Sequence, residues 1–250
     1  MTASSASDLK STGLLGPLNL FPREYAKIKF RTILKEIEHS HLKPQFWYKS
    51  LHQISETILS LARQHEILAL AKEHLGDNIL LWGSQLIHQA VGAGHRWHRD
   101  VEHEKWPGLT IWIALNNLSV NTTISFITKS NHIHVSPQHL LNKGLNIHDS
   151  QVVLKAAQAI EEDCQILTFA LREGQYMVWD GPMWHSTTNS SSDIRSALIL
   201  QFCSSSDVPL IPKSFDIPFQ FYDMPTPSVL MHGVNLNPKN WIINPSIPSN

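Results

Sequence analysis

The chain has 250 residues with a 42% hydrophobic fraction, which suits a globular protein with a real core. Its 20 basic and 21 acidic residues nearly balance, and without a long basic run they argue against a nucleic-acid-binding protein. No apolar run is long enough to cross a bilayer, so no membrane partner is expected.

The two ends of the chain and its thiols indicate a simple organisation. Residues 1–13 are small and polar and lack the features of a signal peptide, so we expect them to be disordered. All-β barrels often reach this length as one domain, which predicts a single domain over 14–250. Cys164 and Cys203 are too few for a disulfide framework, and we expect two buried thiols in a cytoplasmic protein.

Two helices are predicted in the first third of the chain. The first runs from Pro22 to Glu38, where Pro22 suits the first turn and apolar residues recur at helical spacing. The second runs over 53–74 with a broad apolar stripe, and Gly76 ends it.

After Gly76 short runs of β-branched and aromatic residues alternate with Gly, Asn, Pro and Ser clusters. This order favours a mainly β fold with flanking helices: a double-stranded β-helix (jelly roll, cupin-like) with the N-terminal helices packed on one side. Residues 152–162 could form a helix or an insert, and the tail from Pro225 is expected to be irregular. The predicted strands are 79–90, 109–115, 123–128, 165–170, 175–179, 195–203 and 217–222.

A histidine and a carboxylate stand two residues apart in the first chemically informative segment. Side chains alternate along a strand, so His98 and Asp100 would project to one face. A second histidine would complete the two-histidine, one-carboxylate triad of non-haem iron(II) oxygenases. The pair is weak evidence alone, because a His-x-Asp match occurs by chance in a chain with 15 histidines.

The second half of the chain offers the missing parts. His185 follows a predicted strand, and Arg195 stands ten residues later on the next strand. A guanidinium binds a carboxylate through two parallel hydrogen bonds, which suits a dicarboxylate cosubstrate.

The ordered set of these segments resembles the phytanoyl-CoA dioxygenase family of iron(II)/2-oxoglutarate oxygenases. The resemblance begins at residues 13–18, continues through 97–100 and the strand 110–115, and ends with the segment from His185 to Arg195. It implies that His98, Asp100 and His185 bind Fe(II) as catalytic ligands, with 2-oxoglutarate and dioxygen as cosubstrates.

The resemblance also implies further roles around the cosubstrate. Arg195 would bind the far carboxylate of 2-oxoglutarate, with Trp112 and Thr187 beside it and Gln85 as a further candidate. Asp100 stands where related halogenases carry Gly or Ala, which favours hydroxylation. The family often has Gly-Ser-His where this chain has Ser130 followed by Asn, and Ala197 replaces a serine that many related oxygenases have.

The implied activity is oxidation of an unactivated C–H bond of a small metabolite, by hydroxylation or by N-dealkylation in specialised-metabolite biosynthesis. Alternatives are a hydroxylase of an acyl-CoA or carrier-bound acyl group, an inactive jelly-roll binding protein and a zinc hydrolase using the same ligands. Oligomeric state is left open, and residues 101–106 are a candidate substrate contact. The other tryptophans and histidines are interpreted as core, structural or solvent-exposed residues: Trp97, Trp179, Trp184, His95, His103, His132 and His134.

Overall fold

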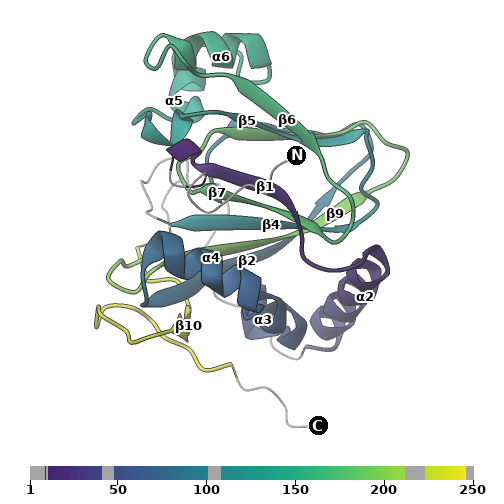
Figure 1. Cartoon of the computed structure of the whole chain (residues 1–250), viewed down its shortest axis with the longest axis vertical. Helices are drawn as coiled ribbons and strands as arrows, with labels where there is room; N and C mark the ends of the chain where they lie inside the picture. The colour runs from purple at the N-terminus through teal and green to yellow at the C-terminus, as the bar shows by residue number, and fades with distance from the viewer. Residues whose placement is uncertain (1–8, 10, 41–47, 101–107, 212–222, 246–250) are drawn as a thin grey trace.

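The computed structural model describes residues 9, 11–40, 48–100, 108–211 and 223–245, which form two antiparallel sheets (Figure 1). The smaller sheet contains, in spatial order, β3 (Gly94–His98), β8 (His185–Asn189), β5 (Thr122–Ile127) and β6 (Ile166–Ala170). The larger contains β1 (Leu14–Asn19), β7 (Gln175–Asp180), β4 (Leu109–Asn116), β9 (Arg195–Ser204), β2 (Ile79–Gln89) and β10 (Val229–His232).

Two groups of helices cover different parts of this core (Figure 1). The helices α2 (Arg23–His39), α3 (Glu56–Ala62) and α4 (His65–Leu75) lie below the larger sheet, with the 3₁₀ helix η1 (Leu51–Gln53) between α2 and α3 in the chain. The 3₁₀ helix η2 (Ser130–His132), α5 (Pro137–Asn142) and α6 (Ser150–Gln158) belong to the segment between β5 and β6. This arrangement confirms the predicted mainly β fold with N-terminal helices on one side.

Alternation along β4 explains why the larger sheet has two apolar faces. Ile111, Ile113 and Leu115 pack in one buried cluster with residues of α3 and α4. Trp112 and Ala114 belong to a second cluster, which includes side chains of β5 in the smaller sheet. A strand that is buried on both faces reads as a continuous apolar run, as β4 does. Apolar side chains from both sheets therefore line the space between them, and any polar group there has apolar neighbours.

The predicted helix over 53–74 is wrong in one respect, because the segment forms two helices. Ser55 caps α3 by accepting a hydrogen bond from the backbone N–H of Ile58, and the chain turns at Arg63 and Gln64 before α4. No glycine or proline marks this break. Both helices bury apolar side chains in the same core cluster.

The ends of the chain also differ from expectation. Leu9, inside the segment predicted to be disordered, is 2% exposed and lies in the core cluster under the larger sheet. The strands β1, β8 and β10 were not predicted. β1 contains Pro17, which an edge strand tolerates, and β10 is a four-residue edge strand in the tail predicted to be irregular. The predicted strand 217–222 lies outside the described residues.

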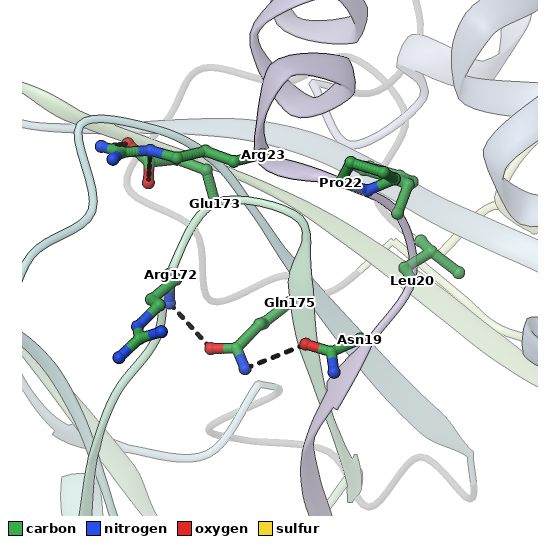
Figure 2. A pocket seen from close by; sticks show the side chains of 8 residues that line it. Asn19, Leu20, Pro22, Arg23, Arg172, Glu173 and Gln175 are labelled. Atoms are coloured by element: carbon green, nitrogen blue, oxygen red, sulfur yellow. Dashed lines mark hydrogen bonds and ion pairs between the residues drawn. The ribbon is translucent and has the colours of Figure 1, made fainter.

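The start of α2 is fastened to the turn before β7 (Figure 2). The buried Glu173 forms an ion pair with Arg23, in which Oε2 lies 3.0 Å from the Arg23 Nε. Its other oxygen accepts a hydrogen bond from the backbone N–H of Leu118. Gln175 donates to the side chain of Asn19, at the end of β1. These contacts fix the edge of the larger sheet. Among the described residues no helix has the length and apolar character needed to span a membrane.

A buried histidine couples the stability of this fold to pH. His52 is fully buried, accepts a hydrogen bond from the Ser84 hydroxyl and donates to the carbonyl of Pro227. Burial lowers its pKa to about 4. An unfolded histidine titrates near 6.5, so between these values the unfolded chain binds more protons. The contribution is present above pH 6.5 and is lost as pH falls towards 4.

We expect replacement of His52 to flatten the acid side of the stability profile. Lowering the pH from 7 to 5 should cost the wild type about 2 kcal/mol more than His52→Gln, because only the wild type must keep a buried imidazole neutral. Urea unfolding at both pH values measures the difference. His148→Gln, at an exposed histidine, is the control. An equal loss in wild type and His52→Gln would contradict the prediction.

Candidate active site

Three potential metal ligands converge between the sheets. His98 ends β3 and is directly paired with His185, the first residue of β8, and Asp100 follows two residues after β3. One ligand atom from each residue lies within 4.8 Å of the other two. The imidazole Nε2 of His185 is 3.5 Å from the Asp100 Oδ1. The two strands are brought together by the smaller sheet, so the ligands meet although they are far apart in sequence.

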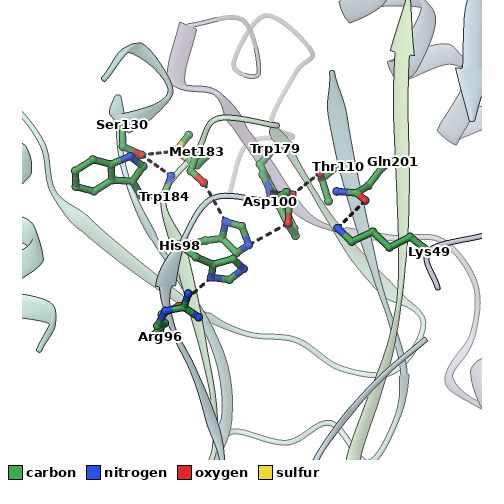
Figure 3. A network of polar contacts seen from close by, with 11 residues as sticks. Lys49, Arg96, His98, Asp100, Thr110, Ser130, Trp179, Met183, Trp184 and Gln201 are labelled. Carbon is green, nitrogen blue, oxygen red and sulfur yellow. Dashed lines mark hydrogen bonds and ion pairs between the residues drawn. The ribbon is translucent and has the colours of Figure 1, made fainter. Parts of the chain in front are cut away.

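The backbone fixes the orientation of both imidazoles. His98 Nδ1 lies 2.9 Å from the carbonyl oxygen of Arg96, and His185 Nδ1 lies 3.0 Å from that of Met183 (Figure 3). A carbonyl can only accept, so each Nδ1 donates its proton there, and Nε2 is the ring nitrogen left to face a metal ion. This is the arrangement in which proteins present histidine to a metal ion.

Asp100 is held by side chains of the larger sheet. Its Oδ2 accepts hydrogen bonds from the Thr110 hydroxyl at 2.6 Å and from the Trp179 indole N–H at 3.1 Å (Figure 3). Its Oδ1 faces the histidines. The carboxylate therefore directs Oδ1 towards the position where a metal ion could contact both imidazoles.

Burial and charge act in opposite directions on these groups. Burial by itself raises the pKa of Asp100, but the charge of His185 and its hydrogen bond, with the Lys49 and His98 charges, hold that pKa well below its usual range. Burial, followed by the neighbouring His185 and His95, lowers the pKa of His98 well below its ordinary value. At neutral pH the set thus consists of a carboxylate and a neutral His98 imidazole, the protonation that metal binding requires.

The chemistry of the set fits a divalent transition metal. Bonds of about 2.1 Å to one ion place neighbouring ligand atoms roughly 3 to 3.5 Å apart, which the His185–Asp100 pair already satisfies. Two imidazoles and a carboxylate on one side leave the remaining positions of a six-coordinate ion to other ligands.

Arg195 lies on the inner face of the larger sheet at the start of β9. Its side chain is buried, packs 5.1 Å from the ring of Trp112 and donates from Nε to the side chain of Gln89. Burial lowers its pKa to about 10, so it is cationic at neutral pH. Within the described residues no carboxylate pairs with it. A buried cation without a counter-ion is costly, so this position favours an anionic ligand.

An amide outside the predicted set connects Arg195 to the smaller sheet. Gln89 accepts from Arg195 and donates to the Thr187 hydroxyl at 3.2 Å, and thus connects Arg195 to β8. Gln85 lies four residues earlier on the same inner face, paired with Ile199, and is half-buried. Gln85 stays a prediction, and Gln89 was not predicted because its direct pairing with Arg195 depends on register.

Lys49 is a second buried cation that sequence reasoning missed. It lies just ahead of η1, on the side of Asp100 away from His98, and its ammonium donates to Gln201 at 3.2 Å (Figure 3). It also lies over the ring of Trp82. Burial lowers its pKa, which the Asp100 charge partly offsets. No sequence pattern marked this lysine, because it reaches the site from outside the two sheets.

His95 is solvent-exposed, as expected, and it also lies next to the site. Strict alternation would place it opposite His98, but an irregularity in pairing between these two residues shifts it. Its ring centroid lies 3.8 Å from that of His98. Burial, followed by the His185 charge, lowers its pKa to about 4.

Most other interpretations of side chains hold. Trp97, Trp179 and Trp184 are buried, and His132 and His134 are exposed. Ser130 is buried and accepts a hydrogen bond from the backbone N–H of Trp184, so its role here is structural. Cys164 and Cys203 are buried free thiols. Residues 101–106, the predicted substrate contact, and His103 lie outside the described residues.

Comparisons with known proteins agree with this geometry. The family model for phytanoyl-CoA dioxygenase (PhyH) matches residues 29–197. None of the curated protein sequences compared with the chain matches it. The structure is similar to the non-haem monooxygenase ThoJ in its nickel complex (15% identity, TM-score 0.67), covering 98% of this chain and 89% of ThoJ.

Two further solved structures share the fold. CytC3 with Fe(II) and alpha-ketoglutarate has 14% identity and a TM-score of 0.68, with 95% of this chain and 91% of CytC3 covered. The epimerase SnoN, in complex with Fe3+, alpha-ketoglutarate and a nogalamycin, has 15% identity and a TM-score of 0.61, with 88% and 93% covered. At these identities the likeness concerns the fold.

The converging ligands generate a direct metal-binding prediction. Metal-free wild type should bind cobalt(II), and His185→Ala should weaken that binding by more than about 100-fold. Losing a residue that only hydrogen-bonds to a metal ligand costs up to about 100-fold, and here the ligand itself is lost. Isothermal titration measures both. His134→Ala, at an exposed histidine, should bind as the wild type does. Unchanged affinity in His185→Ala would contradict the site.

Proposed function

The chain belongs to the phytanoyl-CoA dioxygenase family, and we propose that it oxidises an unactivated C–H bond of a small metabolite with iron held by His98, Asp100 and His185. Family membership confirms the predicted enzyme class, a dioxygenase that depends on Fe(II) and 2-oxoglutarate. The residue roles and the substrate are the proposal.

One observation carries this proposal: three ligand atoms meet in a buried site, and the facing sheet holds a buried arginine that pairs with no carboxylate among the described residues. His98, Asp100 and His185 offer a metal three ligands. Arg195, on the facing sheet, offers a carboxylate two parallel hydrogen bonds. A zinc hydrolase would use the three ligands but would leave the buried guanidinium without a role.

Each protein group has a positioning task in this reaction. When bound, iron with 2-oxoglutarate and dioxygen supplies the oxidant that removes hydrogen from carbon. Arg195 orients the far carboxylate of 2-oxoglutarate, and the Gln89 amide keeps the guanidinium and Thr187 in register. The apolar side chains between the sheets, among them Phe126 and Trp112, exclude water from the reacting groups.

The proposed substrate class is supported by the proteins whose structures are similar to this one. SnoN is named as an epimerase in complex with a nogalamycin, a natural product. We therefore propose a small specialised metabolite as substrate, hydroxylated or N-dealkylated. The family description, which names phytanoyl-CoA, favours a hydroxylase of a thioester-bound acyl group as the second candidate.

The proposed activity predicts oxygen-dependent release of succinate. Purified protein with Fe(II), 2-oxoglutarate and a panel of free metabolites and acyl thioesters should form succinate, whereas Asp100→Ala should lose at least about 100-fold of the rate, because a ligand is missing. Mass spectrometry of the panel identifies the oxidised compound.

The controls separate the competing functions. Succinate formation that requires a thioester would favour the acyl hydroxylase. Metal-dependent hydrolysis that persists without oxygen and 2-oxoglutarate would favour the zinc enzyme. Binding of metal and 2-oxoglutarate without turnover on any compound would favour a binding protein.

The Arg195 guanidinium should determine affinity for 2-oxoglutarate and leave metal affinity alone. Two charge-assisted hydrogen bonds are worth about 3 kcal/mol or more together, so Arg195→Gln should raise the half-saturating 2-oxoglutarate concentration by at least about 100-fold. Anaerobic titration with metal and 2-oxoglutarate measures it. Arg172→Gln, at an exposed arginine, is the matched control. Unchanged 2-oxoglutarate binding in Arg195→Gln would remove this residue from the site.

A further inference from the structure

The three metal ligands are supported in different ways. His98 and His185 are oriented by the backbone carbonyls of Arg96 and Met183, each two residues earlier in the chain. Any amino acid at position 96 or 183 would provide such a backbone carbonyl, whatever its side chain. Asp100 lies beyond the end of β3 and has no strand pairing of its own. Its carboxylate oxygen Oδ2 accepts hydrogen bonds from Thr110 and Trp179.

These two donors form one unit of the larger sheet. Thr110 on β4 and Trp179 on β7 are directly paired, and both are buried, at 1% and 0% exposure. Both donate to the same oxygen, Oδ2, at 2.6 and 3.1 Å. The Trp179 ring also lies 4.9 Å from the ring of His185 and 5.2 Å from that of Phe126. Trp179 thus touches two of the three ligands.

We propose that Thr110 and Trp179 are positioning residues that restrict Asp100 to binding the metal through one oxygen. Two donors occupy the two lone pairs of Oδ2, so only Oδ1 is left for the ion. Binding through both oxygens would break at least one of these buried hydrogen bonds and leave its donor unsatisfied, which disfavours that mode. A single-oxygen carboxylate keeps one more coordination position available to other ligands. This inference rests on the proposed metal site.

The chain provides a matched control for the indole N–H. Trp184 is also fully buried and precedes His185, but its indole nitrogen has no hydrogen-bond partner among the residues described. Trp179→Phe and Trp184→Phe therefore remove the same group from similar surroundings, and only the first removes a bond to Asp100. Thr110→Val removes the hydroxyl at constant shape, whereas Thr110→Ser keeps it.

The test is titration of the metal-free protein with cobalt(II), followed by calorimetry and by the visible absorption of the bound ion. Loss of an outer partner of a metal ligand typically costs 10- to 100-fold in affinity. We expect Trp179→Phe and Thr110→Val each to weaken binding by about that factor and to change the absorption spectrum, because the carboxylate can rotate. Trp184→Phe and Thr110→Ser should stay within about threefold of the wild type, with its spectrum.

The outcomes distinguish this inference from the metal site itself. If the wild type binds cobalt and Trp179→Phe matches Trp184→Phe in affinity and spectrum, Trp179 is a packing residue and the inference is wrong. The same holds if Thr110→Ser is as weak as Thr110→Val. A wild type that binds no cobalt would contradict the proposed function together with the inference. Unfolding temperatures identify any variant that is merely destabilised, and the Trp179 and Thr110 arms each decide the question if the other fails to fold.

Discussion

Placing a carboxylate between two apolar sheets is costly, and much of the site geometry answers that cost. Asp100 is stabilised by two hydrogen bonds to Oδ2 and by the positive charge of Lys49 beyond it. The histidines face its other oxygen. A buried charge persists only when it is paired and hydrogen-bonded. The contacts that stabilise the buried carboxylate also fix its orientation, so the same hydrogen bonds contribute to the stability of the fold and to the geometry of the metal ligands.

Two buried cations lie near the site, and one of them suits the proposed reaction. Arg195 and Lys49 are buried cations whose described side-chain hydrogen-bond partners are the neutral amides of Gln89 and Gln201. Amides orient a cation without neutralising it. The Asp100 carboxylate partly balances Lys49, so the charge left for a ligand to balance is that of Arg195, which favours an anionic cosubstrate over a neutral one.

The two sheets contribute different things to the centre. The smaller sheet brings His98 opposite His185 through the pairing of β3 with β8. The larger sheet provides the groups that hold and surround them: Thr110 on β4, Trp179 on β7 and Arg195 on β9. The site therefore depends on how the sheets face one another, and Trp179, which contacts both Asp100 and His185, spans that interface. A change of sheet packing would alter ligand support and cosubstrate binding together.

Sequence alone determined the elements whose signal is local. Runs of β-branched and aromatic residues gave the strands around Ile111 and Leu198, and helical spacing gave α2. The residue types at 98, 100, 185 and 195 indicated the proposed chemistry. Tertiary structure decided what depends on register and on distant contacts. Four features belong to this group: the break between α3 and α4, the hydrogen bond between Gln89 and Arg195, the irregular pairing next to His95, and the position of Lys49 near Asp100. Each depends on contacts between segments that are distant in the sequence. A pattern of period 2 or 3.6 indicates the face of the strand or helix on which a side chain lies, but not which residues that side chain contacts.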